Sequence, residues 1–219
     1  MLWNGRSPTR HGPRPVLSID QITEATVEIA DEHGLGSVSM QMVANAVGFT
    51  KMSLYRHVNG KDELLAVMVE YAVGEAPTFS PEQPWRSRVE TWADRLAEEW
   101  RAHPWLPHAT VGHRAMGPRE ISWSECVLQA LAELRLAPAE RIDVAFLLFG
   151  HLRNTQSLQT AGTQAWNDPG YRRLLAQRAD EFPAMLEVTA TPATDDFGRE
   201  FGLRLILDGV QALHDARAH

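Results

Sequence analysis

Cationic, hydroxyl and aromatic side chains gather in one short stretch, residues 50–61. Lysine and arginine bind phosphates and guanine edges, hydroxyls donate to phosphates, and polar side chains read base edges in the major groove. Between them, Met52 and Leu54 are apolar and available for packing inward. We therefore expect this stretch to contact a double-stranded DNA partner through the following residues: Thr50, Lys51, Ser53, Tyr55, Arg56, His57 and Lys61, with Ser39 as a further contact upstream.

A second set of side chains could hold a small molecule. Aromatic residues recur at helical spacing in the second half of the chain, and polar groups interrupt an otherwise apolar segment near residue 151, where they need partners. Such aromatic stripes are also typical of plain core packing. The candidate ligand-binding residues are Trp92, Leu96, Trp100, Trp105, His108, Trp123, Phe146, His151, Arg153 and Asn154.

Other chemistry has little support in the sequence. No HExxH, P-loop, G-x-S-x-G or G-x-G-x-x-G pattern is present. His103, His108 and His113 recur every five residues, which scatters them around a helix instead of stacking them as a metal pair. Cys126 is a single thiol, which is usually an inert small apolar residue. We expect no catalytic residues, no metal and no cofactor.

The elements that position residues 50–61 are short helices with clear capping signals. Ser18 with Gln21 forms a capping-box pattern that starts a helix ending near His33. Ser37 or Ser39 can cap a second helix, which Gly48 stops, and a third begins at Thr50. After the Asn59-Gly60 turn, we expect Asp62 to cap a fourth helix from Glu63. The second and third helices with their tight turn form a helix-turn-helix, whose second helix enters the major groove.

The remainder also has helical periodicity and no convincing β-alternation, so the predicted fold class is all-α. A stripe from Trp85 to Trp100 predicts one core-facing helix, after a proline-bearing connection at 76–84. Pro183 could shorten one of the later helices. Expected helices are Trp85–Arg101, Pro104–Val111, Pro118–Leu136, Pro138–Gln159, Pro169–Leu186 and Asp195–Ala218. The expected domains are a basic arm at 1–17, a helix-turn-helix domain at 18–65, and a ligand-binding and dimerisation domain at 66–219.

Charge is distributed unevenly along the 219 residues. The formal net charge of −7 would repel a polyanion. Residues 1–65, however, hold six Lys and Arg against seven acids, so most of the negative charge lies downstream. A single cysteine, no signal-peptide core and no apolar run of membrane-spanning length predict a cytoplasmic protein without a membrane partner. The arm, with three arginines and no acid, could reach a minor groove or be a disordered tail.

The segment 17–69 resembles the TetR/AcrR family of transcriptional regulators. The similarity runs through Ile22, Gly34, Val43-Ala44, Val47-Gly48, Leu54–Val58, Lys61 and Glu63–Leu65, and the wording LYRHVNGKDELL is closest to the tetracycline-repressor-like branch. The resemblance implies a homodimeric repressor that binds a pseudo-palindromic operator and releases it when a small-molecule effector, largely apolar, fills a C-terminal cavity. It also implies dimerisation through Pro138–Gln159 and Asp195–Ala218, where apolar stripes suit a four-helix bundle (Ile142, Ala145, Phe146, Phe149, Leu152; Phe197, Phe201, Leu205, Ala212). The alternative is a helical small-molecule-binding or enzymatic domain with an incidental helix-turn-helix.

Overall fold

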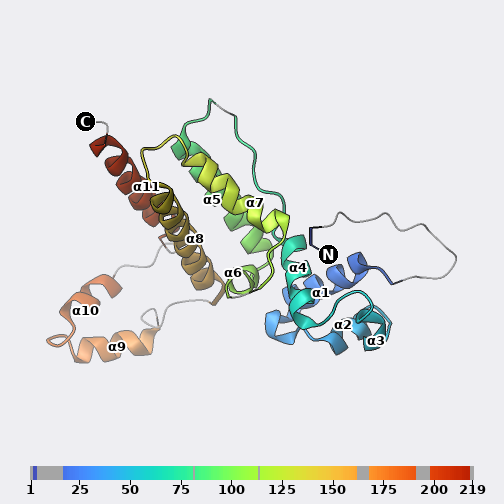
Figure 1. Ribbon diagram of the computed structural model, residues 1–219. Coiled ribbons are helices and arrows are strands. Elements are labelled where there is room, and N and C mark those ends of the chain that lie inside the picture. The colour runs from blue at the N-terminus through green and yellow to red at the C-terminus, as the bar shows by residue number, and fades with distance from the viewer. Residues whose placement is uncertain are drawn as a thin grey trace. The chain divides into compact units, whose positions relative to one another are not determined.

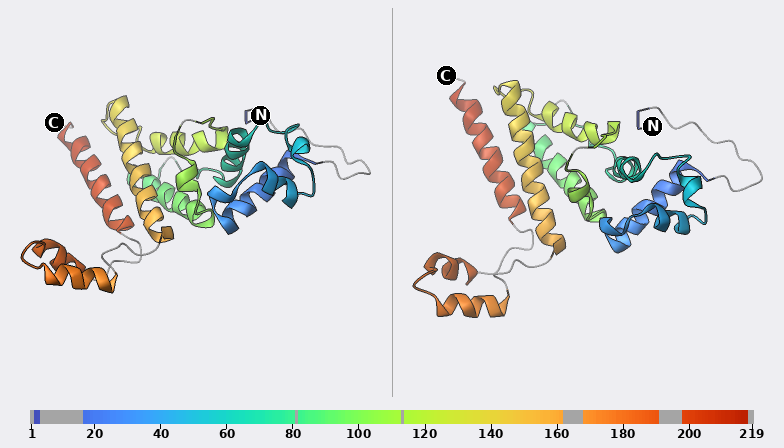
Figure 2. Two further views of the ribbon diagram at one scale, coloured as in Figure 1. Left: turned by 90° about the horizontal axis from the view of Figure 1, so that it is seen from below. Right: turned by 60° about the horizontal axis from the view of Figure 1, so that its bottom comes forward.

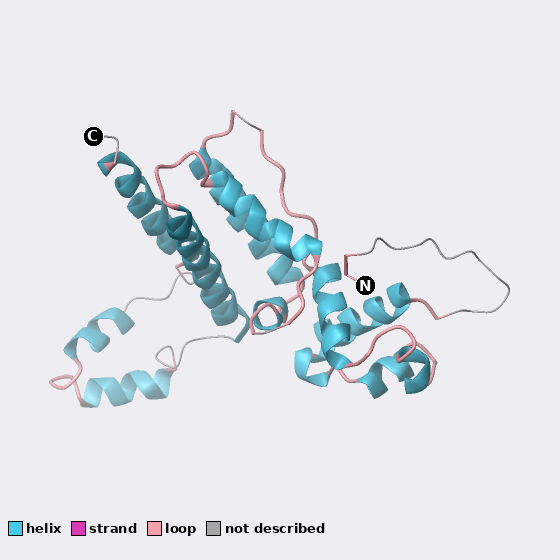
Figure 3. Ribbon diagram, in the orientation of Figure 1, coloured by secondary structure: helices cyan, strands magenta, loops and turns pink. Residues whose placement is uncertain are grey.

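The computed structural model describes residues 2–3, 17–80, 82–112, 114–161, 168–190 and 198–217, and these residues contain helices and no strand (Figures 1 and 3). The all-α prediction is confirmed. The chain divides into two compact units, Met1–Glu133 and Leu134–His219. The first contains α1 (Ile19–His33), η1 (Leu35–Ser37), α2 (Met40–Ala46), α3 (Lys51–Leu54), α4 (Lys61–Ala72), α5 (Trp85–Ala102), α6 (Leu106–Ala109) and α7 (Pro118–Ala130); the second contains α8 (Pro138–Ala161), α9 (Pro169–Gln177), α10 (Pro183–Thr189) and α11 (Arg199–Ala216).

Local capping sets the ends of α1. The backbone N–H of Gln21 donates to the Ser18 hydroxyl at 3.2 Å, and the Gln21 side chain accepts from the Ser18 N–H at 3.0 Å. This is the predicted capping box. The helix ends at Gly34, whose φ of +79° is strained for any residue with a Cβ. The buried face of α1 packs against α2 and α4.

The next two caps match the sequence and the third does not. Ser39 accepts from the Met42 N–H and caps α2, while Ser37 lies in the short η1 helix. Thr50 accepts from the Ser53 N–H and caps α3. The expectation that Asp62 caps the fourth helix is wrong, because α4 begins one residue before it at Lys61 with Gly60 at the cap position. Asp62 lies instead in the first turn, where a carboxylate favours the helix dipole.

The rest of the first unit is built on tryptophan. The predicted stripe on α5 is buried, and the Nε1–H of Trp92 donates to the Trp123 carbonyl at 3.0 Å. Trp123 in turn donates to the Val73 carbonyl at 3.0 Å, which ties α7 to the end of α4. Helices α6 and α7 are shorter than expected. After α7 the chain forms a tight turn, and Leu134 and Leu136, the first residues of the second unit, are buried without being helical.

The expected boundary at 65/66 does not coincide with the compact units. Helix α4 crosses that boundary and packs on α1 as well as on α6 and α7, so residues on both sides fold together up to Glu133. The assignment of DNA binding to 18–65 and of ligand binding and dimerisation to 66–219 therefore remains a functional proposal.

The second unit rests on the pairing of α8 and α11, which lie side by side in all views (Figures 1 and 2). The two helices are antiparallel, because Glu140 near the start of α8 forms an ion pair with Arg217 after the end of α11. Helices α9 and α10 pack together as a separate pair. They replace the single expected helix 169–186: α9 ends at Gln177, and Pro183 occupies the first turn of α10, where proline is favoured. The expected start of the last helix at Asp195, with Phe197, lies outside the described residues.

Within the described ranges, no helix combines the length and apolar character needed to cross a lipid bilayer.

Candidate nucleic-acid interface and effector-binding residues

The helix-turn-helix is anchored by one residue of α3. Leu54 is fully buried, whereas Met52, two positions earlier, is 72% exposed. The expectation that both pack inward is wrong for Met52. Successive helical residues are rotated by 100°, so residues two apart point about 200° apart, and a helix of one turn can bury only one of them. The spacing of the two residues in the sequence is therefore enough to predict that only one of them is buried.

The predicted DNA-contacting residues lie at the surface. Lys51, Tyr55, Arg56 and Lys61 are exposed, and His57 is half-buried in the turn that follows α3. The hydroxyls are already engaged locally. Ser39 and Thr50 cap their helices, and the Thr50 Oγ1 lies 3.0 Å from the Ser53 Oγ. The outward face of α3 thus combines cations with apolar and aromatic groups.

Lys61 is the first residue of α4 and follows a cap position without a side-chain hydrogen bond. Its neighbour Glu63 turns back to the preceding turn, where its carboxylate accepts from the backbone N–H and the side-chain amide of Asn59, both at 2.7 Å. Lys61 is exposed at the N-terminus of α4, a position that suits the binding of a phosphate.

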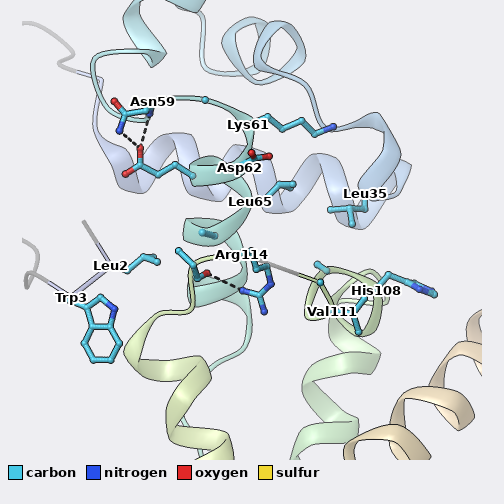
Figure 4. Close-up of a pocket in the computed structure, with 16 residues that line it drawn as sticks. Leu2, Trp3, Leu35, Asn59, Lys61, Asp62, Leu65, His108, Val111 and Arg114 are labelled. Atoms are coloured by element: carbon cyan, nitrogen blue, oxygen red, sulfur yellow. Dashed lines mark hydrogen bonds between the residues drawn. The ribbon is translucent and has the colours of Figure 1, made fainter.

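A hollow of about 1050 Å³ lies beside the start of α4 (Figure 4). The first residues of α4, including Lys61, line one side, and His108 with the segment after α6 lines the other. His108 is thus placed at this hollow. Arg114 also lines it and forms a largely buried ion pair with Glu120 of α7.

The other ligand-binding candidates of the first unit are buried. Trp92, Leu96, Trp100 and Trp123 are almost completely buried. Trp105 is buried too, and its indole N–H donates to the Asp31 carboxylate at 2.7 Å. The same carboxylate lies 2.9 Å from the His103 Nδ1, so α1 is joined to the segment between α5 and α6. No motif indicates this contact, because its partners are more than 70 residues apart.

The candidates of the second unit lie on different faces of α8. Phe146 and Asn154 are exposed, whereas His151 and Arg153 are half-buried. The His151 Nε2 lies 2.8 Å from the Arg199 carbonyl on α11, so its polar group has a structural partner. Burial lowers the pKa of the Arg153 guanidinium from its usual value.

Apolar side chains also stand exposed along both long helices of this unit. Five of the nine dimerisation residues predicted from the stripes belong to this surface: Ile142 and Phe146 on α8, and Phe201, Leu205 and Ala212 on α11. Leu147 and Leu213 add to it, whereas Ala145 and Leu152 are buried within the unit. We call the exposed residues Ile142, Phe146, Leu147, Phe201, Leu205, Ala212 and Leu213 the apolar face.

Across the ranges that the structure describes, no three His, Cys, Asp or Glu side chains lie close enough together to bind a metal ion. His113 of the histidine series lies outside those ranges. Burial raises the pKa of the Cys126 thiol to about 11, and the thiol donates to the Pro77 carbonyl. A thiol with so high a pKa is a poor nucleophile.

Together, an all-helical fold and an outward-facing helix with exposed cations define a helix-turn-helix DNA-binding transcriptional regulator. Residues 22–68 match the family of bacterial regulatory proteins named tetR, and residues 77–214 match the tetracyclin repressor-like C-terminal domain. The chain belongs to the TetR family.

Individual proteins are similar to this chain over most of its length. The HTH-type transcriptional repressor DrrR1 of Streptomyces coeruleorubidus is 33% identical over 97% of this chain and 84% of its own length. The apo structure of ActR from Streptomyces coelicolor matches 94% of this chain and 100% of its own with a TM-score of 0.80 and 24% identity. The structure of ActR in complex with actinorhodin matches 92% and 98% with a TM-score of 0.75 and 22% identity.

Proposed function

We propose that the protein is a cytoplasmic homodimeric repressor that binds a pseudo-palindromic operator and releases it on binding a small, largely apolar effector. The observation that carries the proposal is the surface of α3, where Leu54 is buried and Lys51, Tyr55 and Arg56 are exposed around it. The relative DrrR1, whose name describes a repressor, supports repression over activation.

In this proposal the residues of the interface have different tasks. Lys51, Tyr55 and Arg56 contact base edges and adjacent phosphates, and His57, Thr50, Ser53 and Ser39 contact the DNA backbone. Lys61 binds a phosphate together with the N-terminal amides of α4. Because a phosphate carries no sequence information, Lys61 contributes equally to every duplex, whereas Arg56 contributes to discrimination.

The apolar face forms the dimer interface. Large apolar side chains exposed along two adjacent helices are suited to pairing with the same two helices of a second copy in a four-helix bundle. Two-fold symmetry then presents two α3 helices to successive major grooves, and the operator repeats its half-site in inverted orientation.

The effector acts by shifting a population. If it binds more tightly to the dimer whose α3 helices are wrongly spaced for DNA, it weakens operator binding by the same factor as the operator weakens effector binding. The candidates for contact with such a molecule include the tryptophans of α5 and α7, with Trp92, Trp100 and Trp123 as the first residues to test. Leu96, Trp105 and His108 in this unit, and His151, Arg153 and Asn154 in the second unit, remain further candidates.

The test is gel retardation of the DNA upstream of the protein's own gene, with unrelated DNA of equal length as competitor. Arg56→Ala and Lys61→Ala should each weaken binding at least severalfold, and Lys61→Ala should also lower the salt slope by about one per subunit. Arg173→Ala, an exposed arginine on α9, is the matched control and should bind normally. Actinorhodin, the molecule named in the ActR structure, is the first effector probe. Retardation that does not depend on DNA sequence would refute the proposal.

A further inference from the structure

Met52 is the most exposed large apolar side chain in the part of the chain that the structure describes. It occupies the second position of α3, next to Lys51, and Tyr55 lies three residues further on the same side of the helix, 47% exposed. Covering exposed apolar groups on α3 with a binding partner removes them from water and lowers the free energy. The exposed side chains of Met52 and Tyr55 therefore indicate a surface that a binding partner covers.

The surroundings of Met52 identify the kind of partner. Lys51 and Arg56 are exposed on the same short segment, and Lys61 begins the next helix, so the partner is anionic around its apolar contact. The Thr50 and Ser53 hydroxyls lie 3.0 Å from each other, and the proposed function assigns both to the DNA backbone. An apolar group inside a polyanionic surface is what a duplex offers in its major groove.

In that groove only one base presents an apolar group. Adenine, guanine and cytosine show hydrogen-bond donors and acceptors, whereas thymine shows its C5-methyl group beside one acceptor. A methionine side chain is unbranched and polarisable, so it can follow the contour of such a methyl group. We infer that Met52 is a specificity-determining residue that selects thymine at one position of each half-site through its C5-methyl group. The inference rests on the proposed function, because it assigns one base contact within that interface.

The experiment separates the methyl group from the hydrogen-bonding pattern. A duplex is first selected by the wild-type protein from a random-sequence library, and each thymine of one half-site is then replaced by deoxyuridine, which lacks only the C5-methyl. At one position, the wild type should lose about fourfold in affinity, the effect of uncovering one methyl-sized group. Met52→Ala should bind the thymine and deoxyuridine duplexes equally, and Met52→Leu should keep much of the preference.

The matched control is Met116→Ala, which removes an exposed methionine between α6 and α7 and should retain the full wild-type preference for thymine. The inference is overturned if no position responds to deoxyuridine, or if Met52→Ala retains the same fourfold response as the wild type. Failure of the selection to enrich any sequence would instead refute the proposed function itself. Because Met52 is exposed, its replacement leaves the core intact, and unchanged thermal unfolding of Met52→Ala confirms that affinity alone has changed.

Discussion

The carboxylate of Glu70 on α4 accepts a hydrogen bond from the backbone N–H of Arg119 at the start of α7, at 2.8 Å. Its second oxygen accepts from the N–H of Glu120 at 3.2 Å. A helix of the DNA-binding segment thus supplies the N-terminal cap of a helix in the tryptophan-rich core. The same α4 begins at Lys61, so this polar contact joins α7 directly to the helix that begins at the proposed phosphate contact.

Removing this cap should destabilise the protein. Glu70→Ala leaves two helix N–H groups without their acceptor, and we expect a loss of about 1 kcal/mol in the free energy of unfolding. Gly117→Ala should produce a similar loss, because a Cβ there would overlap the Glu70 carboxylate. In urea unfolding the double variant should be little worse than either single variant, since both remove one contact. Gly36→Ala, with open space around its Cβ, is the control; fully additive losses would contradict this account.

A close contact between α8 and α11 depends on a glycine. A Cβ at Gly202 would lie within 2.9 Å of both ring nitrogens of His151, whose Nε2 lies 2.8 Å from the Arg199 carbonyl. Gly202→Ala should therefore displace the ring and cost about 1–3 kcal/mol in thermal unfolding. The same change in a His151→Ala background should cost much less. Gly209→Ala on the same helix, with open space at its Cβ, should be neutral or stabilising, and an equal loss there would show that helix propensity or crowding elsewhere is responsible.

The proposed dimer gives a direct prediction. Phe146 is 69% exposed on α8 and Phe201 is 58% exposed on α11, so a charge at either site leaves the fold of one subunit intact. Phe146→Glu and Phe201→Glu should convert the dimer to a monomer, because a dimer interface would desolvate the new carboxylates. Sedimentation equilibrium measures the change, and operator affinity should fall with it. Val188→Glu, on an equally exposed apolar residue of α10, should remain dimeric. Unchanged mass for both phenylalanine variants would exclude the apolar face as the interface.

The sequence predicted the local features of the fold well, because capping joins residues three positions apart. Ser18 with Gln21, Ser39 and Thr50 all cap the helices that their spacing indicated. Contacts between distant segments were missed for an equally physical reason. Glu70 and Arg119 are 49 positions apart, and nothing in one sequence tells which acid caps which helix. Which apolar side chain of α3 points to solvent follows partly from the sequence, because the 100° rotation per residue already excludes burying both Met52 and Leu54.

For the candidate site, the types and spacing of residues in the sequence indicate which side chains could bind DNA, but they do not give the contacts that each side chain makes. The clustering of Lys51, Arg56 and Lys61 was visible in the sequence, and all three are exposed. The position of His151 in an apolar helix predicts that its polar group has a partner, and the structure identifies that partner as the Arg199 carbonyl. Polar spacing therefore predicts that a contact exists and leaves open whether protein or ligand provides it.

The last prediction concerns pH. Glu140 accepts two hydrogen bonds from the Arg217 guanidinium, each at 2.6 Å, and one from the Ala137 N–H at 2.7 Å. The Arg217 hydrogen bonds, with the smaller Ala137 contribution, lower the pKa of the Glu140 carboxyl from 4.5 to about 2. A lowered folded-state pKa means that the pair stabilises the protein fully above the unfolded value of 4.5 and loses this contribution as the pH falls from there to about 2. The melting temperature of Glu140→Gln should thus lie below that of the wild type at pH 7, and the gap should close on acidification through this window. Glu187→Gln, an exposed glutamate on α10, serves as the reference for general acid effects, and a gap that stayed constant down to pH 2.5 would show that the Glu140 charge does not stabilise the α8–α11 pair.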